Sequence, residues 1–272
     1  MTDSSHLADR YAEVCNRIGE AAVRSGRRPE EIIVVAVSKY AEPDQIKALV
    51  DLGHRDFGEN QVQQLVQREA VLAEYLDRLR VLSATRRSIA GDTLLPKAAA
   101  QGIRWHMIGH LQRNKARKVI DFVRLIHSVD SLRLAEELQQ AALKRDQNIE
   151  VLIQVNCSGE ASKFGCPVPA ALPLAEQIDT MVNVRVRGVM TMAPLTERPE
   201  DVRPVFVRCR EVFEEFRDAG VGDGQCNLLS MGMSGDYEIA IAEGANIVRI
   251  GSAIFGEQSA ETREHEAGAR AG

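Results

Sequence analysis

The sequence predicts an α/β fold, a single (β/α)8 barrel of the TIM type with an extra helix at the N-terminus. Short β-branched runs alternate with amphipathic stretches, which is typical of parallel strands buried on both faces. A length of 272 residues suits one such barrel. Aromatic residues make up only 4% of the chain, so aliphatic side chains must fill the core, as they do inside a packed barrel.

Eight apolar runs are expected to form the strands. In chain order they span residues 32–37, 55–57, 103–108, 125–129, 151–155, 184–190, 227–230 and 247–250. The helical patterns that surround them span residues 6–24, 43–52, 131–146, 167–181 and 199–219. Proline or a capping residue opens most of these, and Gly53 and Gly220 close two of them. The repetition favours a closed barrel, and an open doubly wound sheet is the structural alternative.

Two regions depart from the repeat. Residues 69–101 are longer than one crossover helix, and residues 83–102 have the composition of an inserted loop, so we place an insertion at about 77–101. Residues 257–272 are rich in Ala, Gly, Glu and Arg and are expected to be a disordered tail. The barrel domain is therefore expected to span residues 1–256.

Charge and cysteine content exclude several classes of protein. A formal net charge of −5 disfavours general binding to nucleic acid or a membrane surface. The five cysteines have no C-x-x-C spacing, which favours a reduced, cytoplasmic protein. The polar N-terminus does not resemble a signal peptide, and the sequence has no apolar run of the length that crosses a membrane.

Lys39 is the sharpest candidate functional residue. It follows an apolar strand and Ser38, so its amine is expected at the mouth of the barrel, partly desolvated. A lysine in that setting can attack a carbonyl group to form a Schiff base. The plainer alternative is a lysine that extends its amine into solvent at a strand end.

Two glycine-rich turns near the C-terminus predict an anion site. Ser234 and Gly235 precede one amphipathic run, and Gly251 and Ser252 follow the last strand. Barrels often bind phosphate after strands 7 and 8, where free N–H groups open a helix. Together with Lys39, these turns indicate a phosphate-bearing carbonyl compound held at both ends.

Other candidates are weaker. His106 and His110 are spaced i and i+4, but the run before Gly109 is expected to be a strand and no third ligand follows, so we predict no metal site. Hydrogen bonding is the expected role of His106. The basic run 113–118 is interpreted as a solvated helix face, Cys157 as a structural thiol, and Asp236 as a helix cap.

Several long motifs resemble the pyridoxal phosphate homeostasis protein family, whose members are similar to the N-terminal domain of alanine racemase. The motifs are VAVSKY, FGENQ, WHMIGHLQRNK, SVDS, VRGVMTM, LSMGMSGDYEIAIAEGA and VRIGSAIFG. The similarity runs from about residue 11 to residue 256, and only residues 69–101 depart from it.

The resemblance implies a cofactor and a set of residues that bind it. Lys39 would form a Schiff base with pyridoxal 5′-phosphate (PLP). The phosphate would be held by four residues, which are Ser234, Gly235, Gly251 and Ser252. Arg249 would face the pyridine nitrogen, and Asn60 with Met231 or Met233 would line the ring. Because a guanidinium group only donates hydrogen bonds, the ring nitrogen would stay unprotonated and the ring would be a poor electron sink.

The resemblance also implies a function. Alanine racemase adds a C-terminal β-domain with a second catalytic tyrosine, and no tyrosine follows Gly256 here. We therefore expect a monomeric PLP carrier or buffer without efficient amino-acid catalysis, with PLP-dependent apoenzymes as candidate partners. The alternatives are a racemase that uses Lys39 as its single base and an aldolase-type enzyme without PLP.

Overall fold

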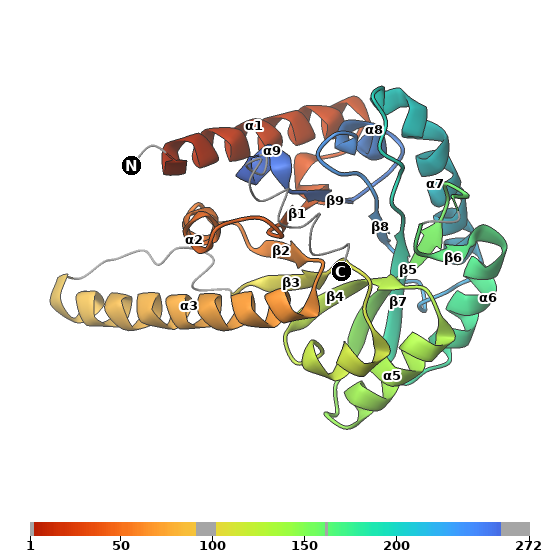
Figure 1. The fold of residues 1–272 in the computed structure, drawn as a ribbon, viewed down its shortest axis with the longest axis horizontal. Coiled ribbons are helices and arrows are strands. Elements are labelled where there is room, and N and C mark those ends of the chain that lie inside the picture. Colours follow the sequence, from red (N-terminus) through yellow and green to blue (C-terminus); the bar gives the residue numbers. More distant parts are fainter. Residues whose placement is uncertain (1–2, 91–101, 161–162, 257–272) are drawn as a thin grey trace, which may run out of the picture.

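Eight parallel strands close into a barrel in the computed structural model, which describes residues 3–90, 102–160 and 163–256 (Figure 1). The strand order is β4-β3-β2-β1-β9-β8-β7-β5, and pairing between β4 and β5 closes the ring. The eight strands are β1 (Ile33–Val37), β2 (Asp56–Glu59), β3 (Arg104–Met107), β4 (Val123–Val129), β5 (Ile149–Asn156), β7 (Val184–Met190), β8 (Leu228–Ser230) and β9 (Ile247–Ile250). A two-residue strand, β6 (Cys166–Pro167), pairs with β5.

Helices surround the barrel on its outer side. They are α1 (Asp3–Arg24), α2 (Pro43–Asp51), α3 (Val62–Ala90), α5 (Leu132–Leu143), α6 (Val168–Asp179), α7 (Arg203–Asp218), α8 (Tyr237–Ala242) and α9 (Ser252–Phe255). Three 3-10 helices are η1 (Pro29–Glu31), η2 (Arg113–Lys118) and η3 (Pro199–Val202). The extra N-terminal helix α1 packs across α8 and α9 (Figure 1).

The closed barrel confirms the predicted fold class, and each predicted apolar run forms a strand. Two strands, 184–190 and 247–250, have the predicted bounds, and the ends of the others differ from the prediction by at most two residues. The basic run 113–118 is a 3-10 helix in place of a full crossover helix. None of the described residues forms a helix long and apolar enough to cross a membrane.

Residues 83–102 are predicted to be a loop within the insertion at about 77–101, and this is wrong for residues 83–90. Helix α3 continues to Ala90 because residues 83–90 contain neither proline nor glycine, and both Gly91 and Pro96 lie farther along. The rest of the predicted insertion, residues 91–101, and the predicted tail, residues 257–272, lie outside the described residues. The domain boundary at residue 256 stays a prediction.

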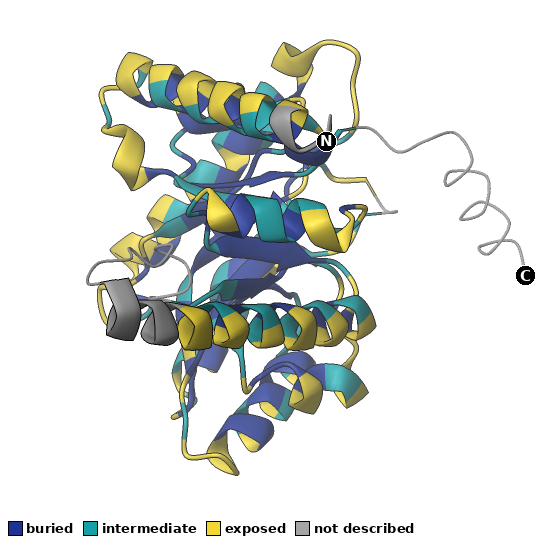
Figure 2. Ribbon diagram, turned by 90° about the vertical axis from the view of Figure 1, so that its left-hand side faces the viewer, coloured by how far each residue is buried: buried dark blue, intermediate teal, exposed yellow. Residues whose placement is uncertain are grey.

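The apolar core has two layers. A small inner cluster fills the barrel and consists of Val35, Leu125, Leu152, Met190 and Ile247. A larger cluster lies between the barrel and its helices. In Figure 2 the strands are buried, whereas the helices turn exposed faces outward. Because aliphatic residues plug its centre, the barrel leaves room for a ligand only at an end.

Gly188 provides a test of the barrel packing. This residue of β7 has φ +150°, and a Cβ atom there would overlap the carbonyl oxygen of Leu228 on β8. We expect Gly188→Ala to lower the free energy of unfolding by about 3 kcal/mol or more, measured by urea denaturation.

Gly26→Ala is the matched control for this variant. Gly26 has φ +70°, but a Cβ atom there meets nothing within 4 Å. Only the backbone penalty of about 1 kcal/mol should remain. Equal losses in the two variants would contradict the close approach of β7 and β8.

Candidate functional site

A cavity of about 480 Å³ opens at the end of the barrel where the strands finish. We call it the rim cavity. Its wall is made by residues that end or follow six strands, and these include Lys39, Tyr40, Asn60, Ile108, Met192, Leu195, Met233, Ser234, Gly235, Asp236, Arg249, Gly251, Ser252 and Phe255. A parallel barrel brings all these strand ends to one rim, so residues far apart in the sequence meet there.

Lys39 stands where β1 gives way to a turn. Its Nζ atom forms a hydrogen bond with the hydroxyl group of Tyr40 and lies 4.1 Å from the centre of the Tyr40 ring. Lys39 is partly buried, whereas Tyr40 is 44% exposed. The amine is therefore held at the cavity wall beside an aromatic face, a favourable setting for a cation.

The loops after β8 and β9 meet at Ser234. The Ser234 Oγ atom accepts hydrogen bonds from the backbone N–H groups of Gly251, at 3.2 Å, and Ala253, at 3.4 Å. A Cβ atom at Gly235 would meet nothing within 4 Å, so that side of the turn is open. A hydroxyl group and backbone amides are thus gathered on one side of the rim cavity, a donor set that suits a phosphate.

Arg249 lies on the inner side of β9 and is 4% exposed. Its guanidinium group donates to Ser230 Oγ at 2.7 Å and to the carbonyl oxygen of Thr191 at 2.8 Å. Burial lowers the pKa of Arg249 to about 10, and the nearby Asp236 charge opposes that shift. A group with that pKa remains positively charged at neutral pH, so a cation forms part of the cavity wall.

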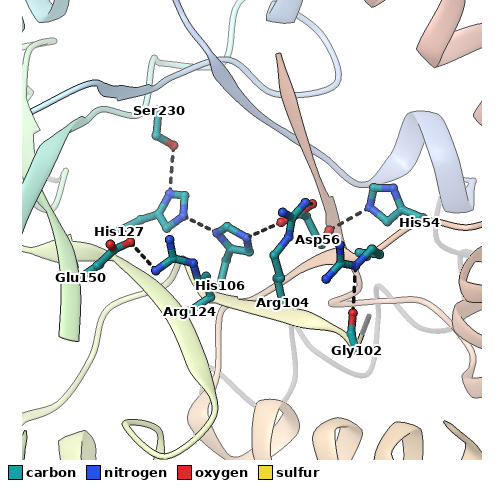
Figure 3. A network of polar contacts seen from close by, with 10 residues as sticks. His54, Asp56, Gly102, Arg104, His106, Arg124, His127, Glu150 and Ser230 are labelled. Atoms are coloured by element: carbon teal, nitrogen blue, oxygen red, sulfur yellow. Dashed lines mark hydrogen bonds and ion pairs between the residues drawn. The ribbon is translucent and has the colours of Figure 1, made fainter. Parts of the chain in front are cut away.

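A chain of buried polar groups connects Arg249 to the opposite end of the barrel, and Figure 3 shows its part from Ser230 to Asp56. Ser230 Oγ lies 2.9 Å from His127 Nδ1, and His127 Nε2 lies 2.9 Å from His106 Nδ1. His106 Nε2 lies 3.0 Å from Asp56 Oδ1, and Arg104 pairs with the other carboxylate oxygen. We call these residues the polar chain.

The proton positions along the polar chain follow from the charge of Asp56. Burial would raise the pKa of Asp56, but hydrogen bonds from His106 and Arg104 hold it below its usual value. An ionised Asp56 needs a donor, so His106 Nε2 carries a proton and His106 Nδ1 accepts one from His127. His127 Nδ1 then accepts from Ser230, whose oxygen accepts from Arg249. In this pattern each ring nitrogen of His106 and His127 has a hydrogen-bond partner.

The structure brings together the residues that the sequence analysis proposed, with one exception. Six of them line the rim cavity together with Lys39, and these are Asn60, Ser234, Gly235, Arg249, Gly251 and Ser252. Met231 is instead fully buried in the core outside the barrel. Gly232, with φ +94°, turns the chain after Met231, and the alternative residue Met233 reaches the cavity wall.

The weaker candidates also have defined places. His106 forms structural hydrogen bonds, as predicted. Asp236 does not cap α8 with its side chain; it accepts a hydrogen bond from the Met233 N–H group and closes the preceding turn. No group of three or more metal-binding side chains occurs in residues 3–90, 102–160 and 163–256. A larger surface hollow of about 740 Å³ is lined by Gln112, by residues of η2 and by Glu137, and it shares none of these residues with the rim cavity.

Sequence reasoning missed parts of the site. Leu195 and Phe255 line the rim cavity but were not predicted to do so. The link between His127 and Ser230 was also missed. A signal for it existed, because His127 lies two residues after Leu125 in an apolar strand, and alternation places both side chains on the face that points into the barrel.

Comparison with known proteins places the chain among related sequences. The family model described as alanine racemase, N-terminal domain, matches residues 33–259. The pyridoxal phosphate homeostasis protein of Aquifex aeolicus is 37% identical over 254 residues, covering 93% of this chain and 99% of the relative.

Two solved structures are also similar. A crystal structure of an unknown protein from Bifidobacterium adolescentis has a TM-score of 0.78 and 35% identity, covering 93% of this chain and 96% of that one. PipY of Synechococcus elongatus PCC7942, solved with PLP bound, has a TM-score of 0.70 and 29% identity, covering 92% and 100%.

The buried position of His127 predicts a pH dependence of stability. Burial, with the nearby charge of Arg249, lowers the pKa of His127 well below its usual 6.5. Below about pH 6.5 the unfolded chain binds a proton that the folded chain does not, so stability falls as the pH falls. We expect the free energy of unfolding of His127→Gln to depend less steeply on pH than that of the wild type, by up to about 1.4 kcal/mol per pH unit. Urea denaturation between pH 7.5 and 5.5 measures both slopes.

The comparison of slopes is the informative measurement. His54 is also buried with a lowered pKa, and it remains in both proteins, so the variant should retain part of the wild-type slope. Identical slopes in the wild type and in His127→Gln would show that His127 is not held neutral.

Proposed function

The chain belongs to the pyridoxal phosphate homeostasis protein family, and we propose that it binds PLP in the rim cavity and acts in PLP homeostasis as a carrier or buffer. One observation carries the proposal. A primary amine, a hydroxyl-and-amide turn and a buried guanidinium group face the same cavity of about 480 Å³. That volume is within the range of small-ligand sites. The PLP-bound structure of PipY supports the choice of ligand.

The chemistry of these three groups fits the three parts of PLP. When bound, PLP supplies an aldehyde, a pyridine ring and a phosphate. Lys39 Nζ is the primary amine on the cavity wall, and we propose that it bonds to the aldehyde carbon as a Schiff base while the aldehyde oxygen leaves as water. Ser234 and the backbone at Gly235, Gly251 and Ser252 would hold the phosphate.

Arg249 is the residue that argues for a carrier over an amino-acid enzyme. We propose that its guanidinium faces the pyridine nitrogen, with Asn60 and Met233 beside the ring. Because arginine only donates hydrogen bonds, that nitrogen would remain unprotonated and the ring would stabilise a carbanion poorly. The bonds to Ser230 and Thr191 hold the guanidinium in place, so the pyridine nitrogen would stay unprotonated for as long as PLP is bound.

An exposed residue at the rim of the cavity supports transfer of PLP to other proteins. Leu195 of the cavity wall is 93% exposed, and we propose PLP-dependent apoenzymes as the recipients of PLP.

The cysteines concern the location of the protein. All five are free thiols, which supports the cytoplasmic location that the sequence predicts. The monomeric state remains a prediction.

Lys39→Ala tests the proposed binding mode. The wild type mixed with PLP should absorb visible light as a lysine-linked Schiff base does, and borohydride should fix a pyridoxyl group on the peptide that contains Lys39. The Lys39→Ala variant should lose both signals because no other lysine among the described residues lines the cavity. The measurements are an absorption spectrum and peptide mass spectrometry.

Lys47→Ala is the matched control, since Lys47 lies on the adjacent helix α2 and pairs with Asp44. It should retain the full signal. If wild-type protein acquires no pyridoxyl group, the PLP proposal is wrong. A trapped sugar or keto acid in its place would favour the aldolase-type alternative.

Exchange of the α-proton of alanine in D₂O separates a carrier from a racemase. With PLP loaded, the wild type should exchange that proton little faster than free PLP does, because Arg249 disfavours the carbanion. NMR follows the loss of the α-proton signal. Rapid exchange that disappears in Lys39→Ala would favour the racemase alternative.

A further inference from the structure

Arg68 connects helix α3 to the turn that carries Lys39. Its Nη1 atom donates to the carbonyl oxygen of Ser38 and to Glu59 Oε1. Its Nη2 atom donates to the carbonyl oxygens of Ala41, at 3.1 Å, and Lys39, at 3.4 Å. One guanidinium group therefore contacts three of the four carbonyl groups between residues 38 and 41.

The turn itself has few other constraints. Regular pairing of β1 ends at Val37, and α2 begins at Pro43. Between them, the Ser38 N–H group donates to the Gly58 carbonyl oxygen at 3.1 Å, and the Ala41 N–H group donates to the Ser38 carbonyl oxygen at 2.9 Å. A turn of this kind would sample several backbone conformations without further bonds, and each would move the side chain of Lys39.

Glu59 fixes Arg68 in turn. It ends strand β2, is fully buried, and its Oε1 atom also accepts a hydrogen bond from the Ser38 hydroxyl group at 2.6 Å. Its Oε2 atom has no hydrogen-bond partner among the described residues, so Glu59 contacts the turn and Arg68 through Oε1. A buried carboxylate needs a cation beside it, and the Arg68 side chain is only 19% exposed.

From these contacts we propose that Arg68 is a positioning residue for Lys39. It fixes the backbone of residues 38–41 so that Nζ lies at the wall of the rim cavity, and Glu59 holds Arg68 in that orientation. This inference rests on the proposed function of Lys39. It adds a residue from α3, a helix of which no described residue lines the rim cavity.

Two phosphorylated ligands separate this role from a general effect on the cavity. PLP can bond to Lys39, whereas pyridoxine 5′-phosphate carries an alcohol in place of the aldehyde and can only fill the pocket. We expect Arg68→Met to weaken PLP binding about tenfold or more, since a mobile lysine forms its bond less favourably. Its affinity for pyridoxine 5′-phosphate should stay within about twofold of the wild type.

A measurement without ligand tests the same idea. Amide hydrogen exchange of residues 38–42 should be faster in Arg68→Met than in the wild type, because the turn has lost its bonds. Arg78→Met is the matched control for both experiments. Arg78 lies on the same helix and pairs with Glu74 at the surface, so its loss should change neither exchange nor affinity.

The single variant leaves Glu59 buried without its cation and could unfold for that reason. The double variant Glu59→Gln with Arg68→Met removes both charges and keeps the experiment decisive. Selective loss of PLP binding with faster exchange supports the proposal. An equal loss for both ligands, no loss for either, or unchanged exchange would overturn it. Wild-type protein that forms no bond to PLP would instead overturn the proposed function itself.

Discussion

A positive charge buried inside the barrel is the constraint around which the polar interior is arranged. Arg249 lies among aliphatic strands, where an unsatisfied guanidinium group would cost several kcal/mol. Ser230 and the Thr191 carbonyl group satisfy it, and Ser230 is oriented by His127. His106 and Asp56 then fix the proton on His127. The hydrogen bonding of one arginine at the rim therefore depends on residues of four strands. The farthest residue, Asp56, lies at the other end of the barrel.

Closure of the barrel is also required for the rim cavity, because it brings the ends of strands distant in sequence to one rim.

Much of this arrangement was predictable from the sequence. Eight apolar runs gave the strands, and polar residues directly after them indicated Lys39, Asn60, Ser234 and Gly251. Strand periodicity is a strong signal when both faces are buried. Helix α3 was harder, because residues 83–90 lack the apolar stripe that marks a packed helix.

The parts that sequence could not give depend on exact direction and on contacts between distant segments. Positions 231 and 233 are both methionine, so the residue type does not distinguish them, and only the turn at Gly232 decides which one faces the cavity. The contact between His127 and Ser230 joins residues on strands that are not adjacent in the sheet, so it depends on how the barrel closes. Arg68 resembles any surface arginine of an amphipathic helix until Glu59 is seen beneath it.

The neutral partners of Arg249 have an electrostatic consequence. Asp56 is matched by Arg104, whereas the two groups that Arg249 contacts are an uncharged hydroxyl and a carbonyl. A protein with a formal net charge of −5 thus keeps an excess cation in a poorly hydrated wall. At long range the acidic surface repels a phosphorylated ligand, and dissolved salt screens that repulsion. At short range the enclosed charge attracts the ligand and is screened much less. Moderate salt would therefore raise the rate at which the anion associates while leaving its attraction to Arg249 largely intact. At an exposed basic patch, salt would instead lower both the rate of association and the affinity.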